Sequence, residues 1–129
     1  SEQLKELKYL RNLLTINGKL IIEVPHSLDA LIVNKELNSF KEFTFWSEHL
    51  ILHTKDSLKK FLIHSGFKRV KFINYQRYDF ENHLNWFIKK KPNGHIKPLF
   101  KVDIKKKKNY EKYLFKNNIS DTLIAVASK

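Results

Sequence analysis

The sequence predicts an α/β fold in which short apolar strands alternate with amphipathic helices. Residues 19–24 are a nearly continuous apolar run, bounded by Gly18 and Pro25, as expected for a buried strand. Residues 121–127 form a second strongly apolar strand. Residues 54–65 lie between them and have the spacing of an amphipathic helix. Strands and helices in this order are typical of an α/β domain.

Size and composition favour one globular unit, and we expect residues 1–129 to form a single domain. The chain is 42% hydrophobic and 13% aromatic, which argues against disorder. The absence of cysteine excludes disulfides, cysteine-based zinc sites and thiol chemistry. No apolar run approaches the ~20 residues of a membrane span, and no signal peptide is visible, so we expect a cytoplasmic protein with no membrane partner.

The charge is strongly positive: 25 Lys and Arg against 13 Asp and Glu give a net charge of +12. Such a charge points to a nucleic acid or another polyanion as one candidate partner. The basic residues are mostly lysines in runs such as 89–91 and 105–108, and no recognition motif accompanies them. We therefore favour a solvated basic surface, with a stand-alone polyanion-binding module as the alternative.

The first predicted elements are a helix and the strand that follows it. Leucines at helical spacing predict an amphipathic helix over residues 3–14. Asn17-Gly18 predicts its end, because glycine adopts the left-handed conformation without a Cβ clash. The helix should pack on the strand at 19–24, which we expect to be covered on both faces.

Residues 26–44 have no clean periodicity. Ser27 is a candidate cap for a short helical turn, and Asn34, Asn38 and Ser39 predict loops. A long irregular segment after a strand end is often functional.

The rest of the chain is better patterned. Thr54 is a good N-cap for the helix that ends at Ser65-Gly66. Residues 67–75 predict a strand with partial alternation, and residues 79–90 a helix. A turn is expected at 91–94, and Tyr110, Tyr113 and Leu114 suit a further helix.

Residues 17–25, Asn-Gly-Lys-Leu-Ile-Ile-Glu-Val-Pro, resemble the fifth strand of class I S-adenosylmethionine-dependent methyltransferases and its approach. The turn at 65–67, Ser-Gly-Phe, resembles that family's turn into strand six. The resemblance implies a partial Rossmann-like sheet, strands five to seven of the family fold, with flanking helices and the last strand, 121–127, inserted antiparallel. Residues 76–119 would then be a substrate-side insertion.

The family's glycine-rich cofactor turn is missing, because Gly18, Gly66 and Gly94 form no cluster. The resemblance therefore implies the C-terminal half of a methyltransferase, inactive alone, whose cofactor, S-adenosylmethionine, is held by residues that are unknown here. Without strand four, the strand at 19–24 would keep a free edge, which predicts a homodimer. An excised piece would also fit a chain that opens Ser1-Glu2-Gln3 and contains no methionine.

Glu48-His49 resembles the Glu-His pair of the subgroup that methylates sugar-like acceptors, and we expect these residues to be catalytic. A histidine near its solution pKa of ~6.5 can take a proton from the acceptor, and the carboxylate can orient it. The family's tyrosine two residues earlier is replaced by Trp46. A buried structural histidine is the alternative. His49 and His53 are spaced like metal ligands, but without a third ligand we expect no metal site.

Amide, guanidinium and aromatic side chains suit a sugar or a nucleotide-linked acceptor. The predicted residues that bind this small-molecule acceptor are His26, Trp46, His53, Gln76, Arg77, Tyr78, Asn82, His83 and Trp86. The expected role is methyl transfer in carbohydrate biosynthesis. A polyanion-binding module and an interaction domain without chemistry are the competing hypotheses.

Overall fold

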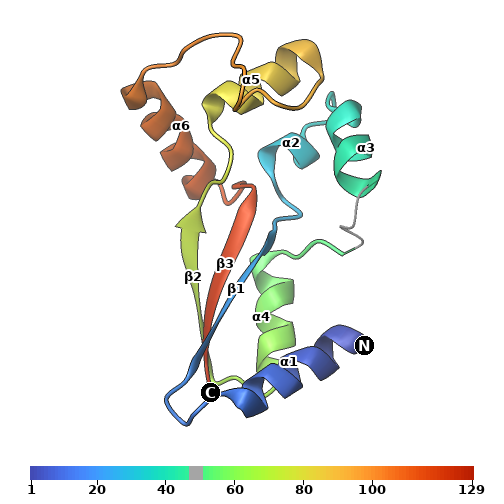
Figure 1. The fold of residues 1–129 in the computed structure, drawn as a ribbon, viewed down its shortest axis with the longest axis vertical. Helices are drawn as coiled ribbons and strands as arrows, with labels where there is room; N and C mark the ends of the chain where they lie inside the picture. The colour runs from blue at the N-terminus through green and yellow to red at the C-terminus, as the bar shows by residue number, and fades with distance from the viewer. Residues whose placement is uncertain (47–50) are drawn as a thin grey trace.

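The computed structural model describes residues 1–46 and 51–129, and of Trp46 it describes the backbone only. Figure 1 shows a narrow sheet with helices beside it and beyond one of its ends. The elements in chain order are α1 (Glu2–Leu13), β1 (Lys19–Pro25), α2 (Ala30–Val33), α3 (Asn38–Trp46), α4 (Lys55–His64), β2 (Arg69–Tyr75), α5 (Phe80–Lys89), α6 (Ile104–Lys116) and β3 (Thr122–Ser128).

The sheet has the order β1-β3-β2, and β3 is antiparallel to both neighbours. The last strand of the chain is therefore inserted antiparallel, as predicted. The α/β class is confirmed by three strands and six helices within the described residues. A sheet of this size does not by itself show a Rossmann-like fold.

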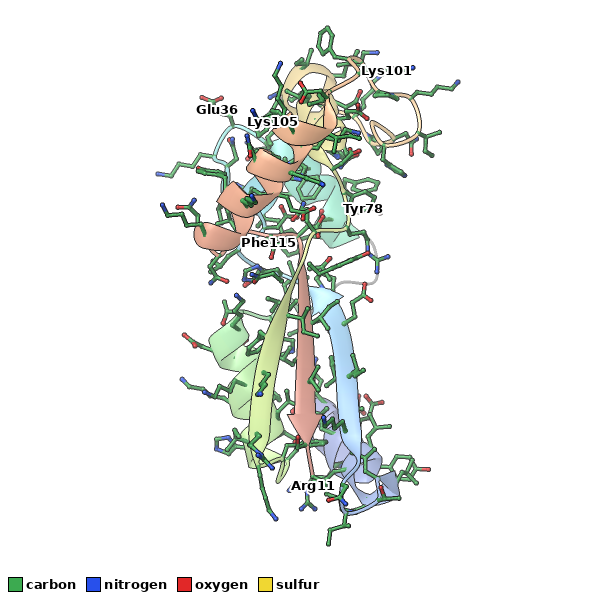
Figure 2. All side chains as sticks on the ribbon, turned by 90° about the vertical axis from the view of Figure 1, so that its left-hand side faces the viewer. Arg11, Glu36, Tyr78, Lys101, Lys105 and Phe115 are labelled. Carbon is green, nitrogen blue, oxygen red and sulfur yellow. The ribbon has the colours of Figure 1, made fainter. Side chains whose placement is uncertain are left out.

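The prediction that the strand at 19–24 is covered on both faces was wrong. Leu20, Ile22 and Val24 point to the covered face, whereas Ile21 on the other face is 68% exposed. The reason is that α1 and α4 lie on the same side of the sheet (Figures 1 and 2). Within the described chain, β1 pairs only with β3, so it is an edge strand.

A compact apolar core lies between the sheet and α4. It consists of six buried residues: Leu58, Leu62, Phe67, Leu123, Ala125 and Ala127. The small alanines of the central strand β3 allow the α4 side chains to approach the sheet closely. Val70 and Phe72 of β2 also face this core, as the alternation of the sequence predicted.

The end of α1 differs from the prediction. The helix stops at Leu13, and the next residue is extended. Gly18 is not left-handed; it is required because a Cβ there would lie 2.8 Å from the Leu14 Cβ. Gly66 has a φ of 93° and does end α4 as predicted.

The start of α4 is confirmed, because the Thr54 side chain accepts from the backbone N–H of Ser57 and the serine side chain accepts in return. Two predictions for 26–44 were wrong. The cap of α2 is Asp29 rather than Ser27, and Asn38 begins α3 rather than a loop. Asp29 competes better for this role because its carboxylate accepts from the N–H of Leu31 at 2.8 Å.

Four helices, α2, α3, α5 and α6, gather beyond the C-terminal ends of β1 and β2 (Figure 1). Here the buried apolar cluster is small, with Leu31, Leu37 and Trp86 packed against Phe40 and Phe87. The predicted helix at 79–90 and the helix around Tyr110 are both confirmed. Much of what is buried at this end is polar.

Candidate functional site

A cavity of about 500 Å³ lies beyond the ends of β1 and β2, among α2, α3 and α5. Figure 2 shows Tyr78 at this end of the sheet and Arg11 at the opposite end. Its lining combines carboxylates, imidazoles and aromatic rings. The lining residues are Glu23, Val24, Pro25, His26, Asp29, Leu31, Ile32, Phe40, Phe43, Thr44, Arg77, Tyr78, Asn82, His83, Trp86, Pro92, Asn93, His95, Asp121 and Thr122.

The cavity brings together six of the residues predicted from the sequence to bind an acceptor. These are His26, Arg77, Tyr78, Asn82, His83 and Trp86. Gln76 and His53 do not line it. The side chain of Trp46 and the predicted catalytic residues Glu48 and His49 lie outside the described residues.

His26 follows β1 directly and is fully buried. Its Nδ1 lies 2.8 Å from the carbonyl oxygen of Ser120. Because a carbonyl oxygen only accepts, Nδ1 is protonated and donates this hydrogen bond. Nε2 is then an acceptor, and no described residue donates to it. Burial lowers the pKa of His26, so the ring is neutral at pH 7.

Asp29 caps α2 and is only 5% exposed. Burial raises the pKa of Asp29 to about 7, and repulsion by Asp121 adds to the shift. Its Oδ1 accepts from the Leu31 N–H, while no donor to Oδ2 is found among the described residues. Asp29 is therefore a buried carboxyl with one acceptor atom left over in the cavity wall.

Asp121 organises the segment that leaves β2. Its carboxylate accepts from the backbone N–H groups of Arg77 and Tyr78 at 2.9 Å, and from the Gln76 side-chain amide at 2.9 Å. The Thr122 hydroxyl donates a fourth hydrogen bond at 2.8 Å. Burial raises the pKa of Asp121, and these donors counteract that shift.

Gln76 is thereby committed to the protein itself. In addition to its bond to Asp121, its Oε1 accepts from the Asp121 N–H at 2.9 Å. It positions the cavity wall rather than lining it. His53 is similarly occupied, because its Nδ1 lies 3.1 Å from the Ser57 hydroxyl and its ring packs edge-on against Phe61.

His83 links α5 to α6. Its Nδ1 is 2.7 Å from the Tyr110 hydroxyl, and its Nε2 is 3.3 Å from the Gln76 amide nitrogen. Because the amide can only donate, Nε2 accepts and Nδ1 donates. Burial lowers the pKa of His83 to about 4 and raises the pKa of Tyr110. The cavity wall is therefore uncharged at this point.

Arg77 is the only Lys or Arg in the lining that residues 1–46 and 51–129 provide, and it forms an ion pair with Glu23 at the end of β1. Both side chains are about half exposed, 52% and 43%. The guanidinium charge is already paired at the mouth of the cavity.

Aromatic rings form another wall. The Trp86 ring packs edge-on against Phe40, with centroids 4.9 Å apart, and against Phe43 at 5.4 Å. The Tyr78 and His95 rings pack at a tilt of 60°, with centroids 5.0 Å apart. Such faces suit the apolar side of a sugar ring or a cation.

The turn at 91–94 closes the cavity against α5. Asn85 donates to the carbonyl oxygens of Lys91 and Pro92 at 2.6 and 3.2 Å. A Cβ at Gly94 would lie 2.4 Å from the Asn85 Cβ and 2.9 Å from the Asn82 Cα, so only glycine fits there.

Sequence reasoning missed Asp29, Asp121, Phe40 and His95 as lining residues. The available signal was position, because Asp29 follows the end of β1 and Asp121 immediately precedes β3. Polar residues at strand ends are frequent in sites of α/β proteins. No group of three or more metal-ligating side chains occurs within residues 1–46 and 51–129.

In the same part of the chain, no helix is long and apolar enough to cross a membrane. Comparison with known proteins gives no match with a family model, a curated protein or a solved structure. The function must therefore be argued from the site itself.

Proposed function

We propose that this chain is the acceptor-binding, C-terminal half of an S-adenosylmethionine-dependent methyltransferase acting on a sugar-like or other small polar molecule. The observation that carries the proposal is the cavity, which gathers six acceptor-binding residues predicted from the sequence at the C-terminal ends of β1 and β2. Ligands of open α/β sheets bind at that end of the strands.

The order of the strands also supports the proposal. In the resemblance, the final strand is inserted antiparallel after strands five and six. The observed order β1-β3-β2 agrees with that expectation. A doubly wound sheet would require further strands beside β1, whose outer edge is unpaired within the described chain.

The described residues do not fit the cofactor. Gly18, Gly66 and Gly94 lie in three separate turns, so they form no cradle for S-adenosylmethionine. The proposal therefore assigns the cofactor to another half of the enzyme. This chain would bind and orient the acceptor, exclude water from it and accept its proton.

Glu48 and His49 are the proposed proton acceptors. They follow Phe43 and Thr44 in the sequence, and both of these residues line the cavity. A histidine oriented by a carboxylate is a suitable base for an acceptor hydroxyl or carbon acid.

Turnover of the intact enzyme tests this role. Glu48→Gln and His49→Ala should each lower kcat by roughly 100-fold or more, with little change in the melting temperature. His64→Ala, on the outer surface of α4, is the matched control and should leave kcat unchanged. Unchanged kcat with a large fall in melting temperature would instead indicate a structural role for the pair.

Cofactor binding tests the division into halves. The isolated chain should show no calorimetric signal with S-adenosylmethionine, whereas the intact enzyme should bind it. Micromolar binding by the isolated chain would contradict the proposal.

A polyanion-binding module remains the second candidate because of one specific feature. Helix α6 carries six lysines in its 13 residues, and most of them are exposed. Binding of duplex DNA or heparin with a steep salt dependence, lost on replacing Lys105, Lys106 and Lys108 by glutamine, would favour this function. Weak binding without a salt slope would favour the methyltransferase proposal.

A further inference from the structure

The charges around the cavity differ in sign from those of the chain as a whole. The chain has a net charge of +12, yet among the described residues no lysine lines the cavity. Three carboxyl groups of that part of the chain do line it, those of Glu23, Asp29 and Asp121. The one guanidinium in the described lining, that of Arg77, is paired with Glu23. The cavity is therefore acidic within a basic protein.

The hydrogen-bonding groups that the cavity wall leaves for a ligand also favour a cation over an anion. The backbone N–H groups of two lining residues, Arg77 and Tyr78, are bound by Asp121. Of the three imidazoles in the lining, the two buried ones, His26 and His83, are neutral and bring no positive charge. Asp29, in contrast, is a buried carboxyl whose Oδ2 has no donor among the described residues. A ligand that supplies a charged N–H donor would satisfy it.

The aromatic wall adds a second, independent preference. Trp86, Phe40 and Phe43 pack together beside the cavity. Aromatic faces attract cations through their quadrupoles, by about 0.5–2 kcal/mol depending on desolvation. A phosphate, by comparison, would meet no free cationic side chain among the described lining residues.

We propose that the cavity binds a small molecule bearing a protonated amine, such as an amino sugar, with the Asp29 carboxylate as its counter-charge and the Trp86, Phe40 and Phe43 rings beside it. This identifies the class of acceptor for the proposed methyl transfer and in that respect rests on it. The binding itself does not depend on any transfer reaction. A nucleotide-linked or phosphorylated acceptor is disfavoured.

Matched sugars test the charge preference at about pH 7, where an amino sugar is largely protonated. Calorimetry or NMR titration of the full chain would compare glucosamine with glucose, galactosamine with galactose, and both with glucose 6-phosphate. Each amino sugar should bind about 10-fold or more tightly than its neutral partner, a difference of about 1.4 kcal/mol. The phosphate should bind most weakly.

Two aspartate variants test the residue. Asp29→Asn should abolish the preference for amino sugars, and it should fold because asparagine is an equally good N-cap. Asp103→Asn is the matched control, since Asp103 is also an N-cap aspartate but lies outside the cavity. The Asp103→Asn variant should keep the full preference for amino sugars. In the NMR titration, the chemical-shift changes caused by amino sugars should be largest for residues of the cavity wall.

Equal binding of amino and neutral sugars, absence of binding by every amino sugar, preferred binding of glucose 6-phosphate, or an Asp29→Asn variant that keeps the preference would each overturn the inference. Methyl transfer by the intact enzyme separates it from the proposed function. Transfer to neutral or phosphorylated acceptors alone would sink the inference and keep the function. Asp29-dependent amine binding without any methyl transfer would keep the inference and sink the function.

Discussion

The two ends of this molecule bury different kinds of side chain. Around the sheet, the buried side chains are almost all apolar, with Leu62 and Phe67 packed against β3. Beyond the strand ends, the buried residues are largely polar or ionisable: His26, Asp29, Glu81, Asn82, His83, Asn85 and Asp121. Apolar burial stabilises directly, whereas buried polar groups are tolerated only when hydrogen bonds replace water. The apolar core thus stabilises the fold at one end, and the candidate site lies at the other.

Most buried polar groups at the helical end are satisfied by the protein. Glu81 accepts from the N–H of Val102 at 2.8 Å and pairs with Lys107 at 3.0 Å. Asn85 and Asp121 are also fully engaged. Asp29 Oδ2 and His26 Nε2 accept no hydrogen bond from a described residue, and both belong to residues that line the cavity. Ser39 Oγ and Asn118 Oδ1 are also buried without a described partner, and these two residues lie outside the cavity lining.

The largest change in stability should follow a substitution in the apolar core at the sheet. Leu62 has no exposed surface, so Leu62→Ala should lower the free energy of unfolding by about 2–5 kcal/mol through lost burial and a cavity. Ile63→Ala, the neighbouring side chain that is 44% exposed, is the control and should cost well under half as much. Urea denaturation measures both. Similar losses for the two variants would show that α4 does not pack on the sheet as described.

Asp29→Asn should raise the free energy of unfolding at high pH, whereas Leu62→Ala lowers it. Because the pKa of Asp29 is raised to about 7 in the folded state, its contribution to stability is greatest below its unfolded pKa of 3.8 and is lost as pH rises to about 7. The full pKa shift of Asp29 corresponds to about 4 kcal/mol in the free energy of unfolding. Structural relaxation around the charged carboxylate should reduce this to roughly 2 kcal/mol. The variant should therefore be more stable than the wild type at about pH 8, by thermal denaturation.

Other titrating groups face Asp29, so only the difference between variant and wild type isolates it. Asp121 has a raised pKa and acts in the same direction, whereas His26 and His83 have lowered pKa values and act oppositely. Tyr110 is also coupled to it and has a raised pKa. The stability difference should grow from about pH 4 to 7 and then level off. A difference independent of pH would contradict a buried, titrating Asp29.

The junction between the two ends should show a smaller effect. Thr54 caps α4 at its N-terminus, in a reciprocal pair with Ser57. Thr54→Ala should destabilise by about 1 kcal/mol, and Thr54→Ser by much less, because serine keeps the acceptor. If Thr54→Ala lost as much free energy of unfolding as Leu62→Ala, the cap would do more than satisfy the end of one helix, which would contradict this prediction.

The same contrast explains how far the sequence could be interpreted. Apolar periodicity predicted the strands and the helices at 54–65 and 79–90, and side-chain chemistry pointed to six cavity residues, because period and residue type are local properties. The sequence could not reveal that Asp29 is buried, since burial depends on tertiary packing. Nor could it reveal that Asp121 holds the segment after β2, since that role arises from contacts 43 to 45 positions apart. It misjudged β1 because coverage of a strand's second face depends on which helices pack there.

Self-association should be the weakest effect, and it concerns the sheet end alone. The outer edge of β1 pairs with no strand of the described chain, and Ile21 and Ile73 are exposed on the uncovered face of the sheet. Such an edge favours pairing with a second copy as a two-fold dimer. Lys19 and Glu23 interrupt the apolar row, so we expect a dissociation constant of roughly 100 µM, about 5–6 kcal/mol of association.

Light scattering across that range of concentration measures it. Ile21→Lys should abolish association without loss of stability, because the side chain is exposed and a lysine opposes edge pairing. Ile63→Lys, on the outer side of α4, is the control and should leave association intact. If Ile21→Lys associates as well as the wild type, another surface is responsible. If the wild type stays a monomer with fast amide exchange along β1, the edge is simply solvated, and only the polar end of the molecule has a binding surface.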